Sequence, residues 1–222
     1  MKCHLQTIGV YSMVDFNLIS ENLQKGKAKD VEALVQQAVD ENVAAKDILE
    51  QGLMAGMSVV GERFKKNEIF VPEVLIAARA MKAGVKILRP LLVTAGVQSR
   101  GTVVIGTVKG DLHDIGKNLV AMMMEGAGLR IVDLGTDVSP ERFVESAKAE
   151  NANIIACSAL LTTTMTQMKN VVQAAESAGI RDHVKIMVGG APVTESFCKS
   201  IGADRYAADA ATAAEIAASL CA

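Results

Sequence analysis

The residues best suited to chemistry in this 222-residue chain lie in one short run, Gly110-Asp111-Leu112-His113-Asp114-Ile115-Gly116. His113 offers an imidazole to a proton or a metal, although a lone loop histidine is more often satisfied by a backbone carbonyl. Asp111 can accept a hydrogen bond from one ring nitrogen and leave the other nitrogen free for a metal. The pair therefore predicts a carboxylate–histidine–metal arrangement with His113 as the metal ligand.

The scarcity of other metal-binding residues near His113 limits the type of metal centre that it could serve. Four cysteines are scattered without a C-x-x-C pair, and neither a cysteine nor a second histidine lies near His113. This argues against a four-ligand zinc site. A metal whose other ligands come from a macrocycle needs only one protein ligand. Haem meets that condition, but haem pockets are usually apolar clefts between helices.

Two later segments carry weaker signals, namely Ser158-Ala159-Leu160 and Gly189-Gly190. Most Gly-Gly pairs are simply turns, and Ser158 and Leu160 have little meaning alone. After a central strand, however, two glycines allow a backbone to approach a ligand closely. Whether these two segments indicate a binding site depends on where the fold places them.

The second half of the chain alternates short β-branched runs with helical segments. Strands are expected over 102–108, 130–134, 153–158, 185–188 and, more weakly, 205–207. This βαβ succession predicts a flavodoxin-like (Rossmann-like) five-stranded parallel sheet with strand order 2-1-3-4-5. The first, third and fourth strands are then neighbours, so the three segments meet at their carboxyl ends. We expect one shared binding site there.

The first half follows a helical period, clearest in the stripe Val74, Ala78, Met81, Val85, Leu88 and Leu92. Helices are expected over 16–23, 29–43 and 45–64, with a last one starting at Pro72. Four helices with short connections predict an antiparallel four-helix bundle. A glycine-containing linker over 94–101 separates a helical domain, residues 1–95, from an α/β domain, residues 101–222.

Charge and cysteine content indicate which partners and which cellular compartment to expect. A net charge of -2 without a Lys/Arg cluster argues against a nucleic-acid partner. The sequence contains no uncharged apolar stretch of about 18 residues and no signal-peptide pattern, which argues against a membrane partner. Scattered cysteines fit a reducing compartment, so a cytoplasmic location is expected.

The order and spacing of the motifs resemble a known signature. Asp-x-His-x-x-Gly is followed after 41 residues by Ser-x-Leu and after 28 more by Gly-Gly. This resembles the cobalamin-binding signature of methionine synthase, the B12-dependent mutases and the corrinoid methyl carriers. Val60–Phe64 and Phe70–Leu75 are similar to the helical cap of methionine synthase. The run Ser158–Met165 looks most like the small corrinoid proteins of methylamine, methanol, betaine and aryl methyl ether methyltransferases.

The resemblance implies a role for each matching residue. His113 is the lower axial ligand of cobalt in a base-off, histidine-on cobalamin, and Asp111 is its hydrogen-bonding partner. Thr164 occupies the position of a relay serine in methionine synthase, and a threonine hydroxyl offers the same donor and acceptor. Ser158 and Thr162 contact the displaced dimethylbenzimidazole tail, and the glycine pair gives it room. The full set of implied cofactor-binding residues is Gly110, Asp111, Leu112, His113, Asp114, Gly116, Ser158, Leu160, Thr162, Gly189 and Gly190.

The implied function is that of a methyl carrier in a multi-component methyltransferase system. Co(I) accepts a methyl group from a substrate:corrinoid methyltransferase, and the resulting methylcobalamin passes it to a folate or thiol acceptor through a second methyltransferase. The helical cap covers the methyl-bearing face and moves aside for partners. A reductive activase rescues accidentally oxidised cobalt. The four donor classes named above remain open.

Two other functions share the signature. A cobalamin-sensing regulator joins a helical bundle to the same binding domain, but it also carries a DNA-reading domain, for which this sequence has neither spare residues nor a basic patch. The small subunit of an adenosylcobalamin mutase generally lacks the helical cap. Both functions rank below the methyl carrier.

Overall fold

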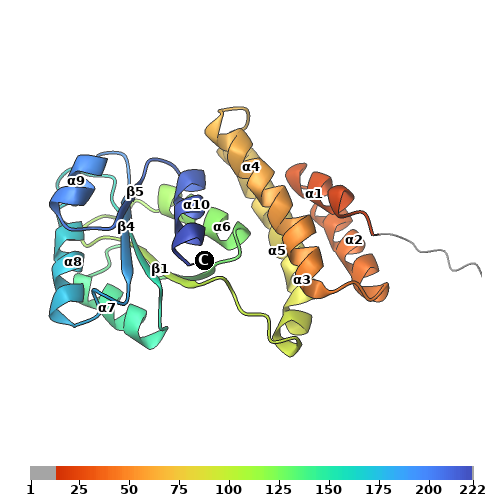
Figure 1. Cartoon of the computed structure of the whole chain (residues 1–222). Coiled ribbons are helices and arrows are strands. Elements are labelled where there is room, and N and C mark those ends of the chain that lie inside the picture. The colour runs from red at the N-terminus through yellow and green to blue at the C-terminus, as the bar shows by residue number, and fades with distance from the viewer. Residues whose placement is uncertain (1–13, 222) are drawn as a thin grey trace, which may run out of the picture.

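The structure, a computed structural model, describes residues 14–221 and consists of a helical part packed beside an α/β part (Figure 1). The first 13 residues of the expected helical domain lie outside the described residues. No helix in the described range combines the length and apolar character needed to cross a membrane.

The helical part contains the four predicted helices. The first two are α1 (Phe16–Gln24) and α2 (Ala28–Asp40), and the last is α5 (Val71–Thr94). The third runs without a break through α3 (Ala45–Asp47), η1 (Ile48–Met54) and α4 (Ala55–Lys65). Its η1 segment is a π-helix, which the sequence analysis did not predict. Gly52 of η1 lies close against Ile19 of α1, where a larger residue would be crowded.

Local sequence explains how these helices begin and which face they bury. The Asp15 side chain accepts hydrogen bonds from two backbone N–H groups at the start of α1. At the start of α5, Pro72 follows Val71, and the Glu73 side chain accepts from the Phe70 N–H at 3.1 Å. The predicted apolar stripe of α5 faces inward, and its fully buried members are Val74, Ala78, Met81 and Leu88.

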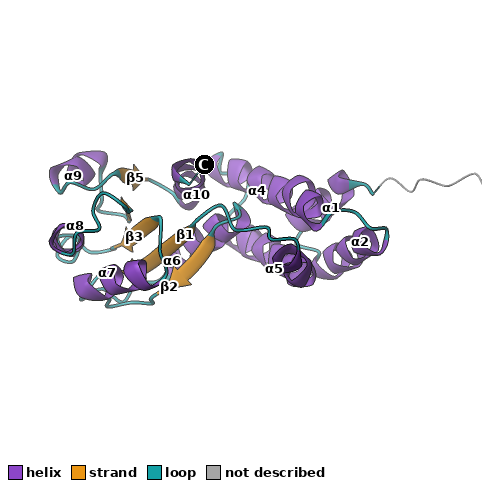
Figure 2. Ribbon diagram, turned by 60° about the horizontal axis from the view of Figure 1, so that its bottom comes forward, coloured by secondary structure: helices purple, strands orange, loops and turns teal. Residues whose placement is uncertain are grey.

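The α/β part confirms the predicted topology. Five parallel strands are hydrogen-bonded in the order β2-β1-β3-β4-β5 (Figure 2). The strands are β1 (Thr102–Thr107), β2 (Arg130–Asp133), β3 (Ile154–Ser158), β4 (Lys185–Gly189) and β5 (Arg205–Ala207). The helices are α6 (Ile115–Gly126), α7 (Pro140–Ala149), α8 (Gln167–Ser177), α9 (Glu195–Ser200) and α10 (Ala210–Leu220).

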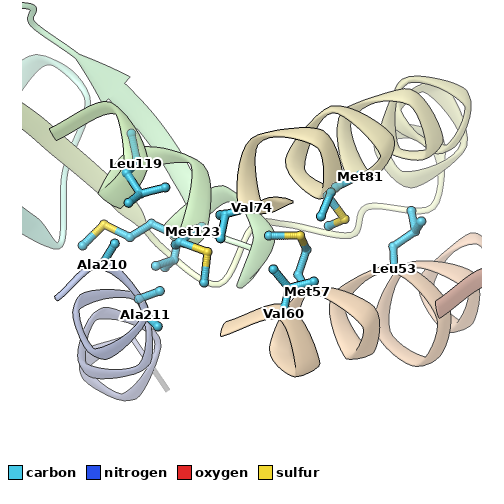
Figure 3. Packing of buried hydrophobic residues seen from close by; sticks show 14 of the residues in the cluster. Leu53, Met57, Val60, Val74, Met81, Leu119, Met123, Ala210 and Ala211 are labelled. Carbon is cyan, nitrogen blue, oxygen red and sulfur yellow. The ribbon is translucent and has the colours of Figure 1, made fainter. Parts of the chain in front are cut away.

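The sheet separates two apolar cores. Residues of α7, α8 and α9 pack on one face, whereas α6 and α10 pack on the other. The second core continues without interruption into the helical part. At this seam, Met57 and Val74 lie opposite Leu119 and Met123 (Figure 3). The four-helix part is therefore docked on α6 and α10.

Polar contacts flank the apolar seam. Lys65 Nζ of α4 lies 2.6 Å from a Glu215 carboxylate oxygen of α10. Lys82 Nζ of α5 lies 2.9 Å from a Glu125 carboxylate oxygen of α6. Both pairs are partly exposed to solvent, so each contributes at most about 1 kcal/mol to docking. The apolar contacts hold the two parts together.

Candidate functional site

The three sequence motifs lie side by side at the carboxyl ends of the central strands. Thr107, Ser158 and Gly189 pair in one row across β1, β3 and β4. The histidine loop leaves β1 from this row, and the Ser158 and Gly189 segments leave β3 and β4 beside it. This is the edge at which open parallel sheets bind their ligands.

Asp111 is the hub of this edge and is fully buried. Its Oδ1 accepts from the His113 backbone N–H at 3.0 Å and lies 2.7 Å from His113 Nδ1. Its Oδ2 accepts from the Thr164 hydroxyl at 2.7 Å and from the Leu160 N–H at 2.8 Å. A longer bond of 3.3 Å comes from the Leu161 N–H. The structure thus brings together His113, Asp111 and Thr164, as the sequence predicted.

These bonds set the charge of Asp111 and the tautomer of His113. Burial alone raises the pKa of the Asp111 carboxyl. The hydrogen bonds from Thr164, His113 and Leu160 outweigh burial and hold this pKa well below its usual range. Asp111 is therefore ionised and can only accept hydrogen bonds. The proton must sit on His113 Nδ1, which leaves the Nε2 lone pair available to a metal.

Two residues that the sequence analysis missed hold the histidine loop in place. The Thr107 hydroxyl, buried at the end of β1, donates to the His113 carbonyl at 2.9 Å. Asp137, in the segment between β2 and α7, holds the loop with two hydrogen bonds. Its Oδ1 accepts from the Gly110 N–H at 2.7 Å, and its own N–H donates to the Asp111 carbonyl at 3.0 Å. Asp137 has a φ of 54°. A single residue with positive φ leaves no periodic signal in a sequence.

The top of the site is open and apolar. The His113 side chain is 52% exposed. Around it stand two leucines and an isoleucine with large exposed surfaces, Leu112 at 73%, Ile115 at 78% and Leu160 at 45%. Such grouped exposed apolar side chains mark a binding surface. Exposed apolar side chains next to the exposed imidazole suit an apolar ligand at this edge.

A cavity of about 400 Å³ extends from this edge between the sheet and helices α6 and α10. Four of the predicted cofactor-binding residues line it, namely Gly116, Ser158, Gly189 and Gly190. Thr162 is exposed and is not among the lining residues. Asp114 accepts a hydrogen bond from the Asn118 side chain at 3.0 Å, at the start of α6. Phe64 of the helical part also lines the cavity.

Gly190 is constrained by a close contact within the protein itself, in addition to its place in the cavity lining. A Cβ on this residue would lie 1.9 Å from the Ala159 carbonyl oxygen, and its φ of 135° is one that other residues rarely adopt. The close approach is therefore between two segments of the protein itself. Gly189 is more tolerant, since its nearest atom would be the Ala207 carbonyl oxygen at 3.2 Å.

Comparison with protein families matches both parts of the chain. Residues 101–217 match a family model described as a B12 binding domain, and residues 16–89 match a second model with the same description. The fold and the site thus define a B12-binding protein, and the chain belongs to this family. It therefore binds a corrinoid.

Individual relatives narrow the class further. Trimethylamine corrinoid protein 1 from Methanosarcina acetivorans is 46% identical over 191 residues, which cover 81% of this chain and 88% of the relative. A cobalamin-binding protein from Desulfitobacterium hafniense has a solved structure that matches with a TM-score of 0.79 and 30% identity, over 94% of this chain and 99% of that one.

A third match is a solved complex, the methanol:cobalamin methyltransferase complex from Methanosarcina barkeri. It matches with a TM-score of 0.82 and 31% identity, over 93% of this chain and 79% of the matched chain. Within the B12-binding family, the chain thus groups with the corrinoid proteins of methyltransferase systems.

Proposed function

We propose that this protein carries a methyl group between two methyltransferases, with His113 as the lower ligand of a bound corrinoid. The supporting observation is the ionised, buried Asp111 that fixes the His113 tautomer at the open edge of the sheet. When bound, the corrinoid supplies a cobalt ion that accepts and releases the methyl group. The protein supplies binding and orientation.

The residues present fit a corrinoid. Within residues 14–221 no three His, Cys, Asp or Glu side chains gather as a metal site, so the donor here is a single imidazole nitrogen. One protein ligand suffices when a macrocycle provides the others. The exposed side chains of Leu112, Ile115 and Leu160 offer an apolar seat for the ring. The adjoining cavity accepts the nucleotide tail.

The chain's own groups then act as orienting elements. Asp111 Oδ1 holds the proton of a neutral His113 ring on Nδ1, which leaves Nε2 as the nitrogen that would bind the cobalt. The Thr164 hydroxyl donates to the other carboxylate oxygen and keeps Asp111 from rotating. Thr107 fixes the backbone of His113 itself. Each role lowers the cost of ordering the imidazole when the corrinoid binds.

For the methyl donor we favour a methylated amine presented by its own methyltransferase. Relatives named for trimethylamine and dimethylamine are 46% and 45% identical, whereas the methanol system's complex is 31% identical. The other partners proposed are a second methyltransferase with a folate or thiol acceptor and a reductive activase. Mixing the holoprotein with candidate donor methyltransferases and following methylation of the corrinoid by absorbance tests this choice.

We further propose that the protein works in the cytoplasm. Cys157, Cys198 and Cys221 are free thiols, and low-potential cobalt needs a supply of cellular reductant. Cell fractionation tests this placement, and recovery of the protein in an extracytoplasmic fraction contradicts it.

The ligand assignment is tested by spectroscopy of protein purified with a corrinoid supply. The Co(II) form should show nitrogen hyperfine splitting from a protein imidazole in its EPR spectrum. His113→Ala should abolish the splitting, and His183→Ala, which alters an exposed histidine far along the chain, should retain it. Absence of the splitting in the unaltered protein would rule out His113 as the ligand.

Methyl transfer is tested separately. The holoprotein alone should demethylate no simple methylated amine, whereas addition of the matching methyltransferase should produce the methylated form. Robust turnover by the holoprotein without any methyltransferase would contradict the carrier role.

A further inference from the structure

The cavity beside the histidine loop has a definite depth, which the strand register reveals. At its mouth lies the row Ser158, Gly189 and Ala207, at the carboxyl ends of β3, β4 and β5. Two residues further into the sheet lies the row Ile105, Ala156 and Met187. Residues two apart on a strand point to the same face, so both rows face α6 and α10, about 6.6 Å apart.

The roof of the cavity follows the same direction. Helix α6 starts at the mouth and runs back along the sheet, so Lys117 lies near the mouth and Met124 lies at the inner end. Helix α10 also starts at the mouth, where Asp209 caps it, and Ala213 lies one turn further in. The inner end is thus enclosed by the row Ile105–Ala156–Met187 below and by Met124 and Ala213 above.

The two ends differ in chemistry. Three polar side chains lie near the mouth: Ser158 carries a hydroxyl, Asp209 caps α10, and Lys117 is paired with Asp133. Tyr206 also lines the cavity, but it pairs with Val188 one residue in from the mouth, and its side chain packs with the core on the other face of the sheet. The residues placed at the inner end, Ile105, Ala156, Met187, Met124 and Ala213, carry aliphatic and thioether side chains, and Met124 and Met187 are almost completely buried. A ligand group with hydrogen-bonding atoms on the edge that reaches the inner end would lose its hydrogen bonds to water, and no side chain there would replace them.

We infer that this cavity selects corrinoids by their lower base, in favour of an alkylated benzimidazole over a purine. This inference rests on the proposed function, in which the nucleotide tail occupies the cavity. The far edge of dimethylbenzimidazole consists of carbon and methyl groups, which suit the thioethers of Met124 and Met187. Adenine presents an exocyclic amine and ring nitrogens at that edge, and one unpaired buried group costs about tenfold or more in affinity.

The test compares two cobamides that differ only in the lower base, dimethylbenzimidazole or adenine. In free solution the two bases dissociate from cobalt with different free energies, which affects the binding of the two cobamides to any protein. The informative quantity is therefore the ratio of the two cobamides' dissociation constants, measured for a variant and compared with the same ratio for the unaltered full chain. Met187→Gln places an amide at the inner end and should shift this ratio toward adenine by about tenfold. Met187→Leu should leave the ratio unchanged.

A second polar variant, Ala156→Ser, covers the case in which Met187→Gln fails to fold, and it should shift the ratio in the same direction. An unchanged ratio in a folded polar variant overturns the inference, as does an equal shift in Met187→Leu. Cobinamide, which lacks the nucleotide tail, separates this inference from the proposed function. If neither cobamide nor cobinamide binds, the proposed function fails; if all three bind with no effect of the variants, only the base selection fails.

Discussion

At the scale of single residues, the site depends on one buried charge and its five hydrogen bonds. Asp111 holds the His113 ring with one oxygen and the β3–α8 loop with the other. A buried carboxylate is costly unless its partners are complete, and here they over-compensate the cost of burial. The orientation of His113 and the stability of the loop therefore have the same cause.

Removing one donor from Asp111 should expose this dependence. Thr164→Val keeps the side-chain shape but takes away the hydroxyl that lies 2.7 Å from Asp111. We expect the free energy of unfolding of the apoprotein to fall by about 1–3 kcal/mol in urea titrations. Thr164→Ser keeps the hydroxyl, so its free energy of unfolding should fall clearly less than that of Thr164→Val. If the two variants lose equal stability, the hydroxyl is not what matters at this position.

The depressed pKa of Asp111 predicts how stability depends on acidity. A carboxyl whose pKa is lower in the folded chain stabilises the fold fully above its unfolded pKa, near 3.9, and this contribution disappears as pH falls below that value. The unfolding free energy of the unaltered apoprotein should therefore drop more steeply below about pH 4 than that of Asp111→Asn. Parallel pH profiles of the two proteins would contradict the assignment.

At the scale of elements, three loops from different strands hold one another in position. The β1–α6 loop is gripped by Asp137 on one side and by the β3–α8 loop on the other. The β3–α8 loop in turn depends on Gly190, against which the Ala159 carbonyl packs. Residues that do not contact the His113 ring can thus control its position.

Gly190→Ala should damage the site by displacing the backbone of the β3–α8 loop. Its new Cβ would displace Ala159, whose neighbour Leu160 donates to Asp111. We expect loss of corrinoid binding, measured as cobalt content after purification, with far-UV circular dichroism largely retained. Gly189→Ala adds the same methyl group at the neighbouring residue of the same cavity, so it is the matched control. It should be milder, since the atom nearest to its Cβ would be the Ala207 carbonyl oxygen at 3.2 Å. Equal cobalt content in the two variants would count against this coupling.

The strand order was predictable from sequence because buried parallel strands and their helices alternate with clear periods. The residues Asp111, His113 and Thr164 were predictable because their spacing resembles a known signature. Thr107 and Asp137 were not, since their importance comes from backbone groups that meet only in the folded chain. The π-helical turn in the third helix was missed for a similar reason, because it alters the helical period only locally.

At the scale of the whole molecule, the docking of the helical part is mostly apolar. Gly61 of α4 leaves space for Met123 of α6, whose methyl carbon would lie 3.0 Å from an added Cβ. Methionine adapts its shape at low cost, so such a seam can shift without leaving a permanent void. Such a seam is compatible with the expectation, drawn from the family resemblance, that the helical part moves aside for a partner methyltransferase.

Placing a charge in this seam should open it. Met123→Glu would bury a carboxylate opposite Gly61, a cost that separation of the two parts relieves. We expect a larger radius of gyration by small-angle X-ray scattering, with helix content unchanged by circular dichroism. Met123→Leu should scatter like the unaltered protein. An unchanged radius for a folded Met123→Glu protein would show that other contacts hold the cap.

The hub at Asp111 also dictates when the protein can become functional during its synthesis. Its partners Leu160 and Thr164 follow it by 49 and 53 residues, and the nearby cavity needs α10 at the end of the described chain. A nascent chain that has passed the histidine loop therefore carries the metal ligand but not the carboxylate geometry that orients it. Corrinoid loading therefore requires that the β3–α8 loop and α10 have been synthesised and have folded against the histidine loop.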